Sequence, residues 1–213
     1  MLDSQCPSCG APIQIKNQAS LFAVCSYCGT KSLREADKLK EVGKVAALIN
    51  DGTPLKIGTR GRFEGKPFEI IGRIQLQFAY GFWNEWHLDS GGRSCWLGEA
   101  TGNYVFTTLT DTAGMNIPPF KQVEVGQMIE LDGEQFFATD ILDGKCVSGE
   151  GELPFDFNGG YKAPVIDLVS RKENFATLDY SEEKPLLFLG EYAEFKELNL
   201  TDMRELEGWQ KPA

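Results

Sequence analysis

The spacing of apolar residues changes near residue 55 of this 213-residue chain. Beyond that point, short apolar runs alternate with glycine-containing turns, a pattern typical of antiparallel strands spaced about 8–12 residues apart. The expected strands are 55–63, 67–78, 83–89, 94–98, 103–109, 121–131, 135–142, 161–170, 173–180 and 185–190. The pattern predicts a mainly β body of small antiparallel β-barrels or sandwich-like sheets.

Residues 32–54 follow a helical spacing instead. Ser32-Leu-Arg-Glu35 has the form of a capping box, and Asn50-Asp-Gly52 followed by Pro54 is a stop signal. Between them, apolar residues recur every three or four positions, at Leu33, Ala36, Leu39, Val42, Ala46 and Ile49. This segment is therefore expected to be a linker helix.

Part of the β pattern occurs twice. Residues 55–68 match residues 123–136 at a constant offset of 68, and residues 96–106 match 177–187 more loosely at an offset of 81. The offsets differ by 81 − 68 = 13 residues, which places an insertion in the second copy, near the glycine-rich, acidic stretch 143–160. We expect an internal duplication, with related β subdomains at 55–118 and 119–197 and a C-terminal tail at 198–213.

Two cysteine pairs dominate the N-terminus. Cys6-Pro-Ser-Cys9 and Cys25-Ser-Tyr-Cys28 are separated by fifteen residues, which is the ligand spacing of a tetrahedral zinc site. Four protein thiolates leave no position for water or substrate, and closed sites of this kind are structural. The sequence predicts a zinc ribbon over residues 1–31 with structural Zn²⁺.

The net charge of −10 is unevenly distributed. Residues 1–50 hold six basic and four acidic side chains, so the remainder carries 15 − 27 = −12. Because nucleic-acid binding depends on a clustered basic face, such a partner is not expected, apart from a weak contact through the ribbon. We expect no membrane insertion and no secretory signal, since neither apolar pattern is present. Metal-spaced cysteines then indicate the reducing cytoplasm.

Several segments besides the ribbon have a familiar form: Gly65-Lys-Pro-Phe-Glu-Ile-Ile-Gly-Arg73, Trp83-Asn-Glu-Trp86, Trp96-Leu97 and Gly149-Glu-Gly-Glu-Leu-Pro154. With them, the chain resembles the bacterial domain-of-unknown-function 4178 family, in which a zinc ribbon often precedes the domain. The resemblance covers roughly residues 5–31 and 55–195. It implies no assigned activity, substrate or catalytic residue.

Two groups of residues are candidates for a ligand or partner surface. His87 is the only histidine, and a mechanism with Glu85 or Cys95 lacks a motif of defined geometry, so a structural histidine is the simpler interpretation. Strand alternation places Trp83 and Trp86 on opposite faces, so we expect one tryptophan to be exposed as a partner anchor. In the acidic stretch, Glu150, Glu152 and Asp156 can hold a divalent cation, a basic peptide or a cationic small molecule, although a solvated loop is simpler.

These features favour a non-enzymatic binding or adaptor module with a protein partner. The alternative is a ligand-binding protein or enzyme that uses the 143–160 loop with His87 or the tryptophans. A deep pocket with convergent polar groups would support the alternative, and a flat aromatic patch would support the adaptor.

Overall fold

The computed structural model describes residues 2–209, and these residues form a β protein. The one helical element among them is a single 3₁₀ turn at Phe120–Gln122. The strands are β1 (Leu2–Gln5), β2 (Pro12–Ile15), β3 (Phe22–Val24), β4 (Thr30–Glu35), β5 (Lys38–Lys44), β6 (Arg60–Phe63), β7 (Lys66–Phe78), β8 (Gly81–Ser90), β9 (Arg93–Ala100), β10 (Asn103–Thr110), β11 (Met128–Leu131), β12 (Glu134–Leu153), β13 (Lys162–Ser170), β14 (Asn174–Asp179) and β15 (Leu186–Ala193). The mainly β prediction is confirmed.

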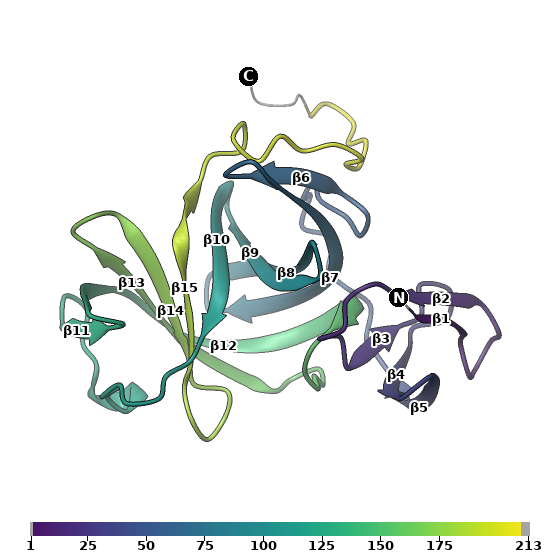
Figure 1. The fold of residues 1–213 in the computed structure, drawn as a ribbon, viewed down its shortest axis with the longest axis horizontal. Coiled ribbons are helices and arrows are strands. Elements are labelled where there is room, and N and C mark those ends of the chain that lie inside the picture. The colour runs from purple at the N-terminus through teal and green to yellow at the C-terminus, as the bar shows by residue number, and fades with distance from the viewer. Residues whose placement is uncertain (1, 210–213) are drawn as a thin grey trace.

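Eight of these strands close into a ring (Figure 1). β7 to β10 form one antiparallel meander and β12 to β15 form another. The meanders are joined at two seams, where β7 pairs with β12 and β10 pairs with β15. The two halves of the body therefore share one sheet rather than closing as separate barrels.

The halves match in register as well as in strand order. β6 and β11 begin 128 − 60 = 68 residues apart, as do β7 and β12. The hairpin turns have the same backbone conformation, with φ of 47° at Glu64 and 49° at Asp132. Each long strand has a β-bulge at the same place, after Ile70 in β7 and after Ala138 in β12.

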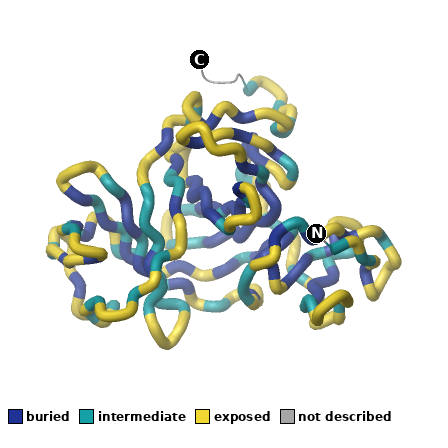
Figure 2. The backbone as a smooth tube through the Cα atoms, in the orientation of Figure 1, coloured by how far each residue is buried: buried dark blue, intermediate teal, exposed yellow. Residues whose placement is uncertain are grey.

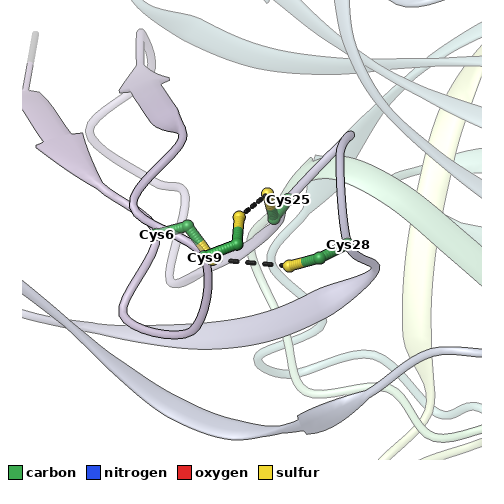
Figure 3. A group of neighbouring side chains, drawn as sticks. All are labelled: Cys6, Cys9, Cys25 and Cys28. Carbon is green, nitrogen blue, oxygen red and sulfur yellow. Dashed lines mark hydrogen bonds between the residues drawn. The ribbon is translucent and has the colours of Figure 1, made fainter.

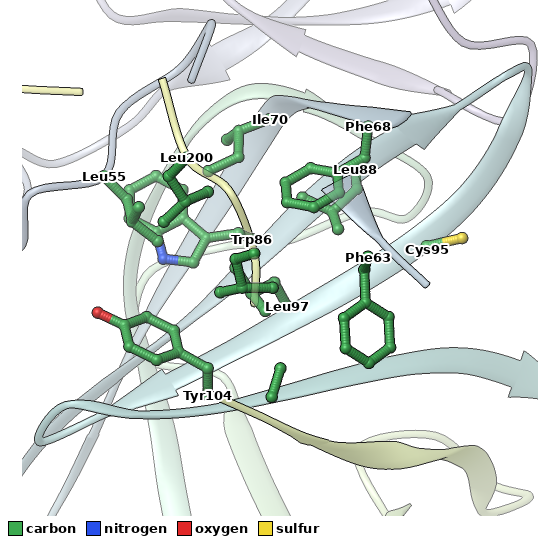
Figure 4. Close-up of a cluster of buried hydrophobic side chains, with 12 residues drawn as sticks. Leu55, Phe63, Phe68, Ile70, Trp86, Leu88, Cys95, Leu97, Tyr104 and Leu200 are labelled. Atoms are coloured by element: carbon green, nitrogen blue, oxygen red, sulfur yellow. The ribbon is translucent and has the colours of Figure 1, made fainter. Parts of the chain in front are cut away.

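Each half has a hydrophobic core of its own. The first core is built from β6 to β10, with Leu55 and the tail residues Leu198 and Leu200 packed over it (Figure 4). The second core comes from β11 to β15 and is covered by the connection that contains Phe120 and Val123. Residues on the opposite faces of the ring strands form a third cluster. Most exposed residues lie in turns, coloured yellow in Figure 2.

The predicted linker helix was wrong. Ser32, the expected cap, is a buried strand residue paired with Ala23, and the chain reverses at Ala36, whose φ is 52°. Residues 45–55 form neither helix nor strand. The side chain of Gln75 donates to the carbonyl of Ile49 at 2.9 Å and accepts from its N–H at 2.8 Å. Pairing with β3 and these side-chain bonds satisfy the backbone, so tertiary structure overrides the local helical pattern.

The expected 143–160 loop is also shorter than its sequence indicated. β12 continues to Leu153, so the first eleven residues of that stretch are strand. Two other strands are shorter than expected, since only 60–63 and 128–131 pair within the ranges 55–63 and 121–131.

Candidate functional site

The side chains of the four N-terminal cysteines point toward one another (Figure 3). The Sγ atoms of Cys6 and Cys28 lie 3.6 Å apart, those of Cys9 and Cys25 lie 3.7 Å apart, and all four fall within 4.8 Å of one another. Thiolates about 2.3 Å from a tetrahedral zinc ion would be separated by about 3.8 Å. The site therefore has the donors and the spacing to hold a metal ion.

The two halves of this site are built alike. In each knuckle the glycine N–H donates to the carbonyl of the first cysteine at 2.9 Å, from Gly10 to Cys6 and from Gly29 to Cys25. Both glycines have positive φ, 76° and 68°, which suits a residue without Cβ. Cys6 and Cys25 are buried in a small core with Ile15. Four thiolate donors complete a tetrahedron, so the geometry is that of a closed site.

The ribbon is docked on the ring through Glu152. β3 pairs with the end of β12, and the Glu152 carboxylate accepts hydrogen bonds from the N–H groups of Lys16 and Asn17, at 2.9 and 3.2 Å. It also accepts the Ser20 hydroxyl at 2.8 Å. This carboxylate, expected on a ligand surface, is buried and engaged in holding the ribbon.

Asp156 has a similar role. Its Oδ1 lies 2.6 Å from the ammonium of buried Lys31, which also donates to the carbonyl of Phe157 at 2.6 Å and to Asn158 at 2.9 Å. Glu150 lies 3.6 Å from the Arg73 guanidinium. The three acids of the 143–160 stretch are thus directed to three different basic or backbone groups and do not converge.

Trp86 lies in the first core and is fully buried (Figure 4). Its Nε1–H donates to Glu99 at 2.8 Å, and the Arg73 guanidinium stacks over its ring at 4.7 Å. Glu99 also accepts from Thr53, and Arg73 pairs with Asp51 at 2.5 Å. This buried polar network ties the 45–55 segment to the ring.

His87 is fully buried. Its Nδ1 lies 2.9 Å from the Glu152 carbonyl and its Nε2 lies 2.8 Å from the Ser94 hydroxyl. Burial lowers the pKa of His87 to about 4, so the ring is neutral near pH 7. Cys95 belongs to the first core, on the other face of the sheet, and the structure does not bring it to the imidazole.

The interior of the ring contains a cavity of about 450 Å³, to which all eight ring strands contribute. Trp83 and Glu85 line it, together with residues that our sequence reasoning did not select: Trp96, Asp140, Phe155, Tyr161, Asp167, Asp179, Phe188 and Tyr192. Two glycines leave room for the side chains that line the cavity. A Cβ at Gly144 would lie 2.4 Å from the Trp83 ring, and one at Gly98 would lie 3.4 Å from the Glu85 carboxylate. Exposed residues such as Asn103 and Asp140 in the lining connect the cavity to solvent.

The cavity favours protonated carboxyl groups. Burial, followed by repulsion from Asp167, raises the pKa of Glu85 to about 8, against a hydrogen bond from Trp83 Nε1. Burial also raises the pKa of Asp167 to about 6, and it raises the pKa of Asp179. Perturbed carboxyls gathered in one cavity are a recognised sign of a functional site.

Comparison with known protein families matches residues 56–195 to the family described as "Domain of unknown function (DUF4178)". The chain belongs to this family. The DUF4178 region spans both halves of the ring and leaves the ribbon outside it. No match was found among curated proteins or among solved structures.

Residues 2–209 include no helix of the length and apolarity that a membrane crossing requires.

Proposed function

We propose that this DUF4178 protein binds a small molecule in the cavity of its strand ring. The observation that supports the proposal is the cavity itself, which combines about 450 Å³ of space, aromatic walls and convergent carboxyl groups. Its volume lies in the range of small-molecule sites, about 300–1,000 Å³. The ligand-binding alternative is therefore the better hypothesis, with Trp83 and Glu85 in the site and the 143–160 acids outside it.

The adaptor hypothesis rested on the closed metal site and on the absence of a catalytic arrangement, and an exposed tryptophan was expected as its partner anchor. Trp83, Trp86 and Trp96 are all buried, so the expectation that one face would expose such a residue was wrong. Both faces of β8 are covered, one by the first core and one by the ring interior. A protein partner remains an untested expectation, and these residues do not support it.

We propose binding rather than turnover as the role of the cavity. Among its described lining residues there is no cysteine, serine or histidine, so neither a cysteine–histidine nor a serine–histidine pair is assembled there.

A cavity-filling variant tests the proposed function. N-phenyl-1-naphthylamine, a neutral dye that fluoresces in apolar sites, should bind the native protein saturably. Val105→Trp places a large ring in the cavity lining and should abolish binding. Val125→Trp, at an exposed position outside the lining, should leave it unchanged. Equal dye binding by native protein and Val105→Trp would contradict the proposal.

We further propose that the ion in the cysteine site is structural Zn²⁺, because four thiolates at this spacing select it over harder cations. The expected result is one zinc ion per chain by elemental analysis and loss of zinc in Cys25→Ser. Cys146→Ser, which removes a buried thiol outside the site, is the matched control. A full zinc content in Cys25→Ser would overturn the assignment.

The reduced thiols that such a site needs support the cytoplasm as its compartment. We also propose that the body arose by internal duplication, which the matching offsets, turns and bulges of the two halves support.

A further inference from the structure

We infer that the ligand of the cavity is an organic cation, with an ammonium group among Glu85, Asp167 and Asp179 and an apolar part against the aromatic rings. We infer also that the cation enters in exchange for a proton. This inference rests on the proposed function, because it names the ligand class of the same cavity.

The charge of the cavity is one-sided. Its lining includes Glu85, Asp140, Asp167 and Asp179, and it includes no lysine, arginine or histidine. In the described residues, each ion pair involves carboxylates other than these four. Asp140 is exposed, whereas Glu85, Asp167 and Asp179 are half-buried. A partly desolvated carboxyl without a counterion favours a bound proton or a bound cation, since an uncompensated charge away from water is costly.

Polar partners inside the protein satisfy these acids only in part. Glu85 accepts from the Trp83 indole at 3.0 Å, Asp167 from the Thr177 hydroxyl at 2.7 Å, and Asp179 from the Ser181 N–H at 2.7 Å. Each carboxyl group has two oxygens with several acceptor positions. Acceptor capacity therefore remains, and an ammonium group, with its donors and its positive charge, is complementary to it.

The walls suit the rest of such a ligand. Trp96 stacks on Phe155 with ring centres 5.7 Å apart and meets Phe188 edge-on at 6.4 Å. Trp83 is held by its hydrogen bond to Glu85. Aromatic faces attract cations and also cover apolar groups. The cavity, with acids on one part of its lining and rings on another, is complementary to a cation with an apolar body.

Every titratable group that faces Glu85 across the ring is acidic or neutral. β13 contributes Asp167, β14 contributes Asp179, and the residue before β13 is Tyr161. The negative charge of Asp140 on β12 contributes to the raised pKa of Asp167. β7, β9 and β10 contribute no titratable side chain to this part of the lining apart from Glu99, whose carboxylate bonds Thr53 and Trp86 in the other layer.

Proton exchange follows from this arrangement. With a pKa of about 8, Glu85 is mostly protonated at pH 7 in the empty protein. A nearby ammonium stabilises the carboxylate and lowers its pKa, so binding releases a proton. The affinity for a cation should then rise from pH 6 to about pH 8 and level off above it, while a neutral ligand should show no such dependence.

Matched amines and alcohols test the inference by calorimetry: butylamine and butanol, hexylamine and hexanol, 2-phenylethylamine and 2-phenylethanol. The amine of the best-fitting pair should bind about tenfold or more tightly than its alcohol at pH 8. Titrations in two buffers of different ionisation enthalpy should show proton release at pH 7. Glu85→Gln should remove the preference for the amine and its pH dependence, and Glu130→Gln, at an exposed position on β11, should preserve both.

The outcomes separate the two proposals. Saturable dye binding that Val105→Trp abolishes, with alcohols bound as tightly as amines in every pair, would overturn the cation and leave the cavity as a binding site. An amine preference that survives in Glu85→Gln would overturn the role of this carboxyl. If neither dye, amine nor alcohol binds the native protein, both proposals fail.

Discussion

The two halves of the ring have one backbone plan and different side chains at corresponding positions. With the shared register, Trp83 corresponds to Ala163, His87 to Asp167 and Gly98 to Asp179. Both halves line the cavity with acids and aromatic rings, but Trp83 of the first half faces two small residues of the second, Gly144 and Ala163. The large ring of one half is thus accommodated because the other half is small at that point.

The two outer cores also differ in polarity at corresponding positions. Arg73 and Trp86 of the first half correspond to Ile141 and Ile166 in the second. The first core therefore contains a buried charged network, whereas the second is apolar. The network is present where Asp51 and Thr53 of the 45–55 segment reach the ring. The same strand arrangement thus accepts either a buried charged network or apolar side chains at these positions. The charged network occurs in the half to which the 45–55 segment is attached.

The largest expected change in the free energy of unfolding comes from replacing Arg73 of the first half with isoleucine, the residue at the corresponding position of the second half. Arg73→Ile leaves Asp51 and Glu150 without their buried partner, and breaking a buried pair costs about 3–5 kcal/mol. Ile141→Val at the corresponding position should cost only about 1 kcal/mol. Urea unfolding followed by tryptophan fluorescence measures both. Similar losses of unfolding free energy in the two variants would show that the charged network contributes no more to stability than the apolar packing of the second core.

A second prediction concerns the pH dependence of the free energy of unfolding at one pair of corresponding positions. The folded pKa of His87 lies below its ordinary value, at about 4, so its contribution is complete above pH 6.5 and is lost as the pH falls toward 4. The folded pKa of Asp167 is raised to about 6, so its contribution is complete below pH 3.8 and is lost as the pH rises through 6. Each is worth about 2–3 kcal/mol.

Between about pH 4 and 6 the two contributions therefore have opposite slopes. Unfolding midpoints measured from pH 4 to 8 should fall less steeply on acidification in His87→Asn and more steeply in Asp167→Asn. If Asp167→Asn leaves the slope between pH 4 and 6 unchanged, the burial argument for this carboxyl is wrong.

The smallest effect is expected at Gly144, whose counterpart is Leu76. A Cβ there would lie 2.4 Å from the Trp83 ring and 2.9 Å from the carbonyl of Ala163, so Gly144→Ala should cost about 1–3 kcal/mol. Trp83→Phe should relieve part of this cost, so the double variant should lose less stability than the two single variants together. Strict additivity would show that the ring and the glycine are not coupled.

Local patterns revealed much of this structure in advance. Strands such as 67–78 and 103–109 were placed within a residue of their ends, because alternation and turn glycines are short-range signals. The cysteine pairs were found for the same reason, since each pair lies within one turn. The β4–β5 hairpin was missed because its pairing partner β3 decides its conformation and no periodicity reports that contact.

The cavity acids were missed for a related reason. Asp167 and Asp179 line the same cavity as Glu85 only because β12 to β15 close on β7 to β10, which brings together residues 167 − 85 = 82 and 179 − 85 = 94 positions apart. Nothing near Asp167 in the sequence distinguishes it from a solvated strand residue. Trp86 and Trp83 were placed on opposite faces by alternation, but the ring covers both faces, and that covering is a property of the whole fold.

The two seams of the ring also govern the order in which this protein can form. Thr107 pairs with Gly190, 83 residues later, and Arg73 pairs with Glu150, 77 residues later. During synthesis the free edge of β7 waits until β12 has been made and the free edge of β10 waits for β15, and contacts this distant in sequence slow folding. The ribbon likewise has no strand to join until β12 is complete. The cavity is thus a late product of folding, and the emerging first half needs protection from pairing with another chain at its open edges.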